Sequence, residues 1–524
     1  MLLAQRTPPD RVVLRLGPTN SGKTHGAIEF LVAQAEQGRS GTYAAPLRML
    51  AQEAYERLRT RLPPERVGLL TGEERINPQA DVVSCTAESA RISGDALALD
   101  EAHWLADPDR GHAWTRLLLA GSHRHIHVAA APEAGHLIRA ALAGARHIET
   151  EQHARQAELL HTSALKPATI PAGSAVVAFS RRAVLALHRE LLDHGRSATV
   201  LYGAMPPGAR REQIRRLTAG EVEVIVTTDV IGHGINLPLR AVAFAETTKF
   251  DGRERRPLRL WEAAQIAGRA GRRGLGAGDG TVAVYASGVP GFAPDRGLVR
   301  AAVAAANGAP SGLSITRAHL RPDWPELGEP APAEIPHALT GWRRAARHEA
   351  RAHPWLRPAP IETLLDQWHA IRASVGVRAA VDAPWPGAGP TVWRLMTLPV
   401  DAGGALAEIA SAVLTGRSLR KLLRAGSVIS RMGLDEAERH AATMRDLRAA
   451  GRSFGPVGGV DPEEASAGEE AASRRIAGLV ARHGPLADAS LCASCGGPCA
   501  PWFRRCDDCH HAVSGWYYGD PYGW

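Results

Sequence analysis

The sequence predicts an α/β protein with two tandem parallel-sheet domains, a mainly helical region after them and a small metal-binding module at the C-terminus. Three observations support this prediction. Short apolar runs alternate with helical stretches over the first 300 residues, this alternation restarts near residue 170, and five of the six cysteines lie between residues 492 and 509. Continuously apolar strands are typical of a parallel sheet that is covered by helices on both faces.

The candidate strands of the two sheets occupy residues 12–16, 82–84, 96–99, 125–130, 175–179, 222–226 and 241–245. Helical patterns, such as residues 24–36 and 47–61, lie between them. The expected domains are residues 1–155, residues 156–300, a mainly helical accessory region at 301–450, a linker at 451–470 and a helix with a zinc-binding module at 471–524. The linker is expected because its residues are rich in Gly, Ser and acids.

The composition is that of an ordinary globular protein with a mildly basic charge. The 524 residues include 62 Lys and Arg against 54 Asp and Glu, which permits a nucleic-acid partner. Lysine occurs only at Lys23, Lys166, Lys249 and Lys421, so the arginine count partly reflects a coding bias. No apolar run is long enough to span a membrane, so no membrane partner is expected. The first sixteen residues lack a signal-peptide core, and a cytoplasmic location is expected.

A phosphate-binding loop follows the first candidate strand and precedes a helical stretch. Its sequence, Gly-Pro-Thr-Asn-Ser-Gly-Lys-Thr, matches the G-x-x-x-x-G-K-T pattern. The backbone amides of such a loop hold phosphate oxygens, the lysine neutralises the β- and γ-oxygens, and the threonine hydroxyl binds Mg²⁺. The expected nucleotide-binding residues here are Gly17, Pro18, Thr19, Asn20, Ser21, Gly22, Lys23 and Thr24.

Two carboxylates end the candidate strand at residues 96–99. Asp100 is expected to hold Mg²⁺ together with Thr24, and Glu101 to orient and deprotonate the attacking water. An Asp-Glu pair after a strand is often only the start of a loop, but its place about 75 residues after a phosphate loop favours the ATPase interpretation.

The second α/β half carries two further motifs. Gln265, Arg269 and Arg272 lie in one helical stretch, and the two arginines are spaced to share a face and reach a γ-phosphate. The alternative is an exposed basic helix. Thr228, Asp229 and Gly232 follow the candidate strand 222–226, and their loop suits contact with both a sugar-phosphate backbone and a nucleotide.

Together these motifs resemble the superfamily 2 helicases, and within them the mitochondrial degradosome RNA helicase family and its bacterial relatives, near the superkiller-type helicases. The motifs run in helicase order over about residues 12–290. The resemblance also rests on the phrases at residues 45–51, 71–75, 85–88, 107–116 and 201–208.

The resemblance implies two RecA-like domains, ATP with Mg²⁺ in the cleft between them, and 3′-to-5′ movement along RNA. It implies an exoribonuclease as a partner, and single-stranded and duplex RNA as ligands, with DNA as the alternative. The residues that it places on the strand are Pro46, Arg48, Thr71, Thr86 and Thr228.

The sequence departs from this family at two places. The family usually has Asp-Glu-Ile-Gln where this chain has Asp-Glu-Ala-His, ending at His103. The segment that couples ATP hydrolysis to unwinding, expected near residues 129–133, lacks the usual Ser-Ala-Thr. Coupling is therefore less well supported than ATP hydrolysis. Two alternatives stay open: a DNA repair or recombination helicase, and an ATP-switched nucleic-acid-binding adaptor.

A β-hairpin is expected around residues 249–254, because Asp251-Gly252 is a strong type I′ turn signal. In the resembled helicases a hairpin in this interval parts the duplex, so Phe250 is expected to stack on the last base pair. A plain surface hairpin is an equal alternative.

Two C-x-x-C pairs at the C-terminus predict a structural zinc site. Four thiolates in this spacing suit tetrahedral Zn²⁺ and leave no open coordination position for catalysis. The expected ligands are Cys492, Cys495, Cys506 and Cys509. The favoured interpretation is a zinc-stapled fold that docks on the protein or a partner, and the alternative is a single-strand binding module.

Overall fold

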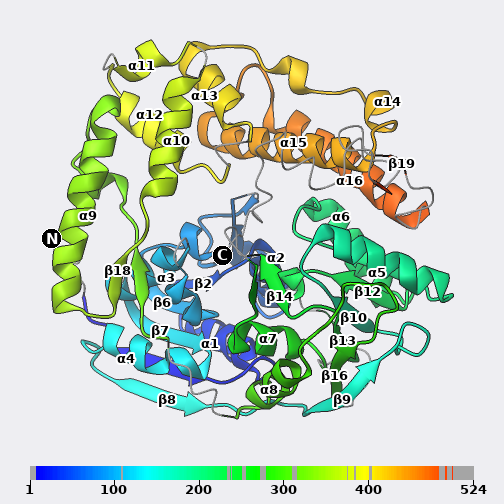
Figure 1. Ribbon diagram of the computed structural model, residues 1–524. Coiled ribbons are helices and arrows are strands. Elements are labelled where there is room, and N and C mark those ends of the chain that lie inside the picture. The colour runs from blue at the N-terminus through cyan, green and yellow to red at the C-terminus, as the bar shows by residue number, and fades with distance from the viewer. Residues whose placement is uncertain are drawn as a thin grey trace. The chain divides into compact units, whose positions relative to one another are not determined.

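The computed structural model (Figure 1) describes residues 7–72, 74–107, 110–232, 237, 239–250, 255–271, 279–309, 315–374, 376–382, 385–400, 404–482, 490–491 and 498–499. The chain divides into two compact units. The first contains Met1–Gln156, Gly312–Ala402 and Leu406–Thr415, and the second contains Ala157–Ser311, Gly403–Ala405 and Gly416–Trp524.

The first unit is built on one eight-stranded sheet, as far as the chain is described, with the order β4-β3-β5-β2-β6-β7-β1-β8. In chain order the strands are β1 (Arg11–Leu16), β2 (Gly41–Ala45), β3 (Val67–Leu70), β4 (Arg75–Ile76), β5 (Val82–Thr86), β6 (Ser93–Leu99), β7 (Ser122–Ala130) and β8 (Ile148–Gln152). Only the short β4 pairs antiparallel in this sheet, and all its other described pairs are parallel. The carboxyl ends of the parallel strands therefore meet at one edge, where ligands bind in open α/β sheets.

Helices α1 (Lys23–Glu36) and α2 (Arg48–Arg59) cover one face of this sheet. Leu31 of α1 and Leu58 of α2 are fully buried in one apolar cluster with Tyr43 and Val82 of the strands. Both helices begin and end within two residues of the predicted helical stretches. Helices α3 (Gly111–Leu119) and α4 (Gly135–Ala141) follow later in the chain.

The first unit also contains most of the chain between residues 315 and 415. Strand β17 (Ala318–Leu320) packs on α3 and pairs with β18 (Leu356–Pro358), and Arg116 of α3 forms an ion pair of 2.6 Å with Asp323. The helices are α9 (Ile335–Ala352), α10 (Glu362–Ala373), α11 (Arg378–Asp382), α12 (Ala388–Met396) and α13 (Leu406–Thr415). Helix α9 is amphipathic because its buried residues recur at the helical period: Ile335, Leu339, Trp342 and Ala346.

The second unit contains a fully parallel sheet of six strands within the described residues, with the order β11-β12-β10-β13-β16-β9. In chain order the strands are β9 (Leu159–Leu165), β10 (Ser174–Val177), β11 (Ala198–Leu201), β12 (Val224–Thr227), β13 (Ala241–Phe244) and β16 (Gly280–Tyr285). The helices that follow them are α5 (Arg181–Asp193), α6 (Pro207–Thr218), α7 (Leu260–Ala267) and α8 (Arg296–Ala306). The two predicted parallel-sheet domains are thus confirmed.

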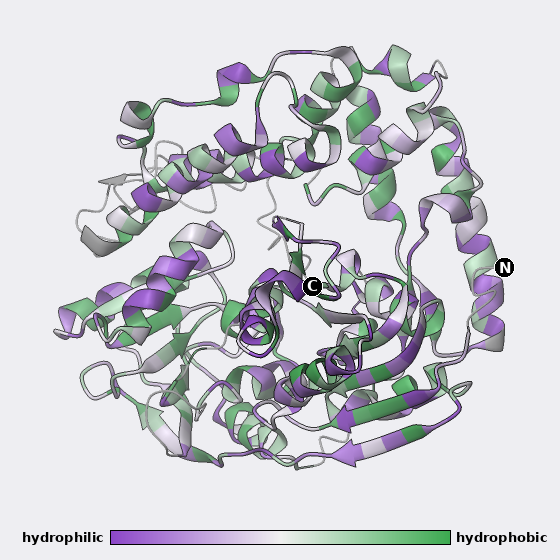
Figure 2. Cartoon of the chain, turned by 180° about the vertical axis from the view of Figure 1, so that it is seen from behind, coloured by the Kyte–Doolittle hydropathy of each residue, from purple (hydrophilic) through white to green (hydrophobic). Residues whose placement is uncertain are grey.

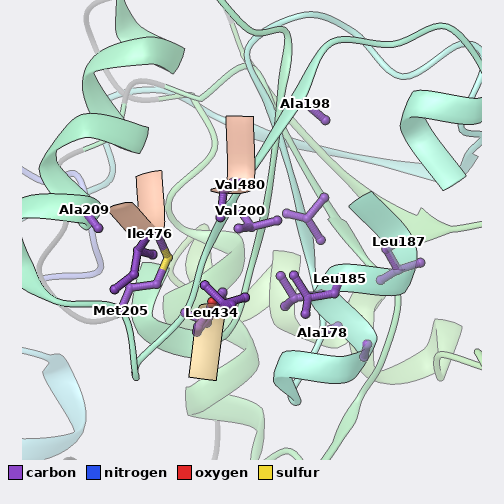
Figure 3. Close-up of a cluster of buried hydrophobic side chains, with 14 of the residues drawn as sticks. Ala178, Leu185, Leu187, Ala198, Val200, Met205, Ala209, Leu434, Ile476 and Val480 are labelled. Carbon is purple, nitrogen blue, oxygen red and sulfur yellow. The ribbon is translucent and has the colours of Figure 1, made fainter. Parts of the chain in front are cut away.

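Helices α15 (Leu434–Phe454) and α16 (Pro462–Arg482) pack against each other and share the core of the second unit. Figure 3 shows Leu434 of α15 and Ile476 of α16 in one cluster with Val200 of β11 and with Met205, which follows that strand. The C-terminal helices therefore complete the apolar core that α5 and β11 begin.

The linker expected at 451–470 is largely helical, and that prediction is wrong. Its glycines allow two helices to approach closely. A Cβ atom at Gly451 would lie 2.5 Å from Pro462, and one at Gly468 would lie 2.9 Å from the sulfur of Met444. Gly451 and Gly468 are thus packing residues of α15 and α16, whereas Gly455, Gly458 and Gly459 lie between the two helices with positive φ.

Figure 2 shows the hydropathy pattern that results: the central strands are hydrophobic, whereas the helices change between hydrophobic and hydrophilic turns. Among the helices that the structure describes, none combines the length and the apolar character needed to cross a membrane.

Candidate active site

The phosphate-binding loop joins β1 to α1 at the carboxyl edge of the first sheet. Two positions require glycine. A Cβ atom at Gly17 would lie 2.6 Å from the carbonyl oxygen of His153, and Gly22 has a φ of +82°. The Nζ of Lys23 donates to the carbonyl oxygens of Gly17 and Pro18, each at 2.6 Å. The ammonium group thus lies within the loop, where a phosphate would meet it.

Asp100 follows β6 and lies beside Thr24, as the sequence predicted. Its Oδ2 accepts hydrogen bonds from the Thr24 hydroxyl at 2.9 Å and from the Tyr43 hydroxyl at 2.6 Å. Burial raises the pKa of Asp100, repulsion from Glu101 adds to the rise, and the two hydrogen bonds offset part of it. A hydroxyl and a carboxylate oxygen at this distance form a pair of hard oxygen ligands that suits Mg²⁺.

Tyr43 is a site residue that the sequence prediction missed. It is fully buried in β2, and its hydroxyl contacts the Asp100 carboxylate directly. A signal was present, because a tyrosine among small residues, as at 41–45, is readily buried and then needs a polar partner for its hydroxyl. The indole nitrogen of Trp114 also donates to the backbone oxygen of Asp100, at 3.1 Å. The carboxylate is therefore held from several sides.

Glu101 and His103 form the next layer of the site. The backbone of Glu101 is left-handed, with φ +47°, and its Oε2 lies 3.5 Å from Nδ1 of His103. The backbone N–H of Ala131 donates to that same Nδ1 at 3.4 Å, and burial lowers the pKa of His103. A neutral imidazole that accepts at Nδ1 carries its proton on Nε2. His103 thus lies between Glu101 and the segment expected to couple hydrolysis to movement.

Four of the residues predicted to grip a strand belong to the first unit and lie at the carboxyl edge of its sheet. Pro46, Thr71 and Thr86 lie at the carboxyl ends of β2, β3 and β5, which are neighbours in the sheet. Arg48 is the first residue of α2. Arg110 supports this edge, since its Nη2 donates to the Pro46 carbonyl oxygen at 2.6 Å and lies 2.7 Å from Glu88.

In the second unit, the predicted loop follows β12. Asp229 lies in it, and the Nζ of Lys249 bridges Asp229 at 3.3 Å and Glu262 at 2.9 Å. Arg256 also binds Glu262, at 2.9 Å. Burial alone would raise the pKa of Glu262, but Arg256 and Lys249 outweigh it and lower the pKa to about 2. This buried ion-pair network was not predicted.

Gln265 lies on α7, and Arg269 lies just after that helix. The guanidinium of Arg269 is buried and donates to the carbonyl oxygen of Gly232. The structure therefore brings two predicted site residues of this unit together. Arg272 lies outside the described residues.

The predicted hairpin has paired strands. Strand β14 (Thr248–Phe250) is antiparallel to β15 (Arg255–Pro257), and Phe250 is half exposed opposite Arg255. The turn residues, including Asp251, lie outside the described part of the chain.

The four predicted zinc ligands, Cys492, Cys495, Cys506 and Cys509, also lie outside the described residues. Among the residues that are described, no group of three or more His, Cys, Asp or Glu side chains is placed to hold a metal ion.

Two family descriptions match this chain. Residues 3–151 match the DEXQ-box helicase domain of Suv3, and residues 159–274 match the helicase conserved C-terminal domain. The chain is 36% identical over 284 residues to the DExH-box ATP-dependent RNA helicase DExH18, mitochondrial, of Arabidopsis thaliana, covering 52% of this chain and 35% of that protein. It is 32% identical over 282 residues to the ATP-dependent RNA helicase SUPV3L1, mitochondrial, of Homo sapiens, covering 50% and 35%.

Among solved structures, S. cerevisiae Dbp5 bound to RNA and ADP BeF3 is similar with a TM-score of 0.44 and 17% identity, over 59% of this chain and 86% of that one. The chain matches little more than a third of the length of the two curated relatives named above.

The expected cytoplasmic location is contradicted, because these relatives are named as mitochondrial proteins. The predicted family is confirmed by both domain matches and by the relatives. Residues 3–151 are therefore a DEXQ-box helicase domain of the Suv3 type, and residues 159–274 are a helicase C-terminal domain.

Proposed function

We propose that this chain is an ATP-dependent RNA helicase that moves 3′ to 5′. The observation that carries the proposal is the meeting of Lys23, Thr24 and Asp100 at one edge of a Suv3-type domain sheet. The names of the relatives support RNA as the substrate, and DNA stays the alternative. The 3′-to-5′ direction rests on the family resemblance.

ATP hydrolysis is assigned to residues of both domains. Lys23 would neutralise the β- and γ-phosphates, and Thr24 with Asp100 would hold Mg²⁺, whose charge stabilises the phosphates when it is bound. Glu101 would orient the attacking water and accept its proton. Gln265, Arg269 and Arg272 are assigned to stabilising the transition-state charge, as the resemblance implies.

The strand would lie along the carboxyl edge where β2, β3 and β5 end. Pro46, Arg48, Thr71 and Thr86 are assigned to it in the first domain, and Thr228 in the second. Phosphate contacts of this kind position a strand without reading its sequence. Phe250 is exposed at the end of β14 and suits stacking on a base.

The C-terminal cysteines are assigned to a structural Zn²⁺ in a ribbon-like module, and an exoribonuclease is the proposed partner. Domain boundaries near residues 155 and 300 are part of the same proposal. The zinc assignment is tested by measuring the zinc content of the purified protein. About one zinc per chain is expected, falling to none in Cys492→Ser with Cys506→Ser. A wild-type chain without zinc contradicts the assignment.

The helicase proposal is tested with duplexes that carry a 3′ or a 5′ single-stranded tail, each made in RNA and in DNA. ATP-driven unwinding of the 3′-tailed RNA is expected, and Lys23→Ala should abolish it. Lys166→Ala is the matched control, because it removes an exposed lysine from outside the site. ATP hydrolysis without unwinding of any duplex would favour an ATP-switched adaptor, and unwinding of DNA alone would reject RNA as the substrate.

A further inference from the structure

A strongly basic segment lies between α13 and α15, within the region predicted as a mainly helical accessory region. Residues 416–434 contain five basic residues and no acidic one, and four of the five fall within the eight residues 417–424. One of them is Lys421, a lysine in a chain whose basic residues are otherwise almost all arginine. We call residues 416–433 the basic segment. Dense basic runs of this length are typical of nucleic-acid contact surfaces.

The basic segment has little regular structure but is anchored at both ends. It contains one short 3₁₀ turn (Arg420–Leu422) and the four-residue helix α14 (Gly426–Ile429). Leu419 is buried, and its N–H donates to the carbonyl oxygen of Gly458 at 2.8 Å. Ile429 and Met432 enter the core of the second unit. The backbone between these anchors is therefore held in one place.

The basic side chains of this segment are exposed to solvent. Arg417, Lys421 and Arg424 are all exposed, and within the described part of the chain none of the three forms an ion pair. Arg420 differs, because it binds Glu464 at 3.1 Å and the Gly459 carbonyl oxygen at 2.7 Å. Three adjacent positive charges are thus uncompensated by carboxylates.

Other arginine-rich helices of the same unit are neutralised locally. On α6, Arg215 lies 2.8 Å from Glu212 and 2.5 Å from Glu221. On α15, Arg448 lies 3.0 Å from Glu469. Acids accompany these arginines on α6 and α15, whereas no acid accompanies Arg417, Lys421 or Arg424 among the described residues.

We propose that Arg417, Lys421 and Arg424 bind the sugar-phosphate backbone of RNA, as a contact outside the two helicase domains. The proposal rests on the proposed RNA helicase function. Guanidinium groups match phosphate oxygens in bidentate geometry, and a lysine supplies a compact charge. An acidic protein partner fits less well, since protein interfaces have apolar and aromatic centres and the segment exposes only one large apolar side chain, Val428, among the described residues.

The test compares two triple variants for binding a fluorescent 20-nucleotide oligouridine without nucleotide, by anisotropy at 50–200 mM NaCl. The first variant is Arg417→Gln/Lys421→Gln/Arg424→Gln. The control is Arg344→Gln/Arg347→Gln/Arg351→Gln, which removes the same charge from the exposed face of α9, where the described residues also provide no ion-pair partner. Circular dichroism of both variants checks that the fold is kept.

The first variant should lower the slope of log affinity against log salt by about 2, since each phosphate contact to a single strand contributes about 0.7. When NaCl is raised from 50 to 200 mM, the factor by which the affinity drops should therefore be about sixteen times smaller for the variant than for the wild type. The α9 control should keep the wild-type slope.

Several results would overturn the assignment: an unchanged slope, an equal loss in both variants, or displacement of the oligouridine by polyglutamate at equal charge concentration. A wild-type chain that hydrolyses ATP but does not bind oligouridine would also overturn it. A different result would contradict the helicase proposal itself: RNA-stimulated ATP hydrolysis that Lys23→Ala leaves unchanged.

Discussion

Removing the Glu438 carboxylate should loosen the C-terminal helices from the second α/β domain. Glu438 lies on α15 and is almost fully buried. Its Oε2 lies 3.1 Å from the Arg181 guanidinium at the start of α5, and its Oε1 accepts from the Tyr202 hydroxyl at 2.6 Å. Burial raises the pKa of Glu438, and Arg181 and Tyr202 offset part of the rise. Asp435 also binds Arg181, at 2.8 Å.

The expected magnitude follows from what each substitution leaves behind. Glu438→Ala leaves a buried arginine with one remaining acid and a buried hydroxyl without its acceptor, so a loss of roughly 3–5 kcal/mol is expected. Glu438→Gln keeps an oxygen for Tyr202 but puts an amide NH2 in place of the oxygen that faces Arg181, so the ion pair is lost and about 1.5–3 kcal/mol is expected. The pair Arg181→Met with Glu438→Leu should recover part of the loss, because no buried charge is then left unpaired.

Hydrogen exchange followed by mass spectrometry on peptides from α5 and α15 measures this effect locally. A loss of about 4 kcal/mol corresponds to nearly a thousandfold faster exchange through the open state. Glu436→Ala is the control, because Glu436 is exposed on the same helix and should cost less than about 1 kcal/mol. If Glu438→Ala behaves like Glu436→Ala, the reasoning that the ion pair holds the helices is refuted.

Three further outcomes are expected. Tyr43→Phe removes a hydrogen bond to the proposed Mg²⁺ ligand, so the Mg²⁺ concentration for half-maximal ATP hydrolysis should rise several-fold; an unchanged value would contradict this role. Gly451→Ala should lower the free energy of unfolding by roughly 1–3 kcal/mol through overpacking, seen as a lower melting temperature, whereas Gly341→Ala, whose added carbon meets nothing within 4 Å, should not. His127 is buried with its pKa lowered to about 3, below its unfolded value near 6.5, so protonation favours unfolding. Its contribution is complete above pH 6.5 and should decline by about 2 kcal/mol at pH 5, a pH dependence that His127→Leu should reduce in urea unfolding.

The sequence predicted the elements whose signals are local. The apolar strands β1, β6 and β10 and the glycine positions of the phosphate loop are visible without any tertiary information, and the structure places Thr24 beside Asp100 as that motif requires. Pattern and spacing suffice there because the same residues both form the element and carry the chemistry.

Features that depend on partners far away in the sequence were missed. Tyr43 gains its role only when β2 and β6 pair, and Lys249 only when β14 approaches Glu262. The prediction of a linker at residues 451–470 failed for the same reason, since Gly451 and Gly468 indicate a flexible chain until the helix that packs against them is known. Glycine is common both in flexible linkers and at close contacts between helices, so composition alone does not distinguish these two structures.

The position of α16 affects how this protein can be synthesised. Tyr285 of β16 and Val480 of α16 belong to the same apolar core, although Val480 follows Tyr285 by 195 residues in the chain. At about 5–20 residues per second, a ribosome takes roughly 10–40 seconds to make that stretch. During this interval the apolar side of α5 and β11 has no cover, and contacts of such long range form slowly. The nascent second domain therefore exposes apolar surface of the kind that chaperones bind until α16 has been made.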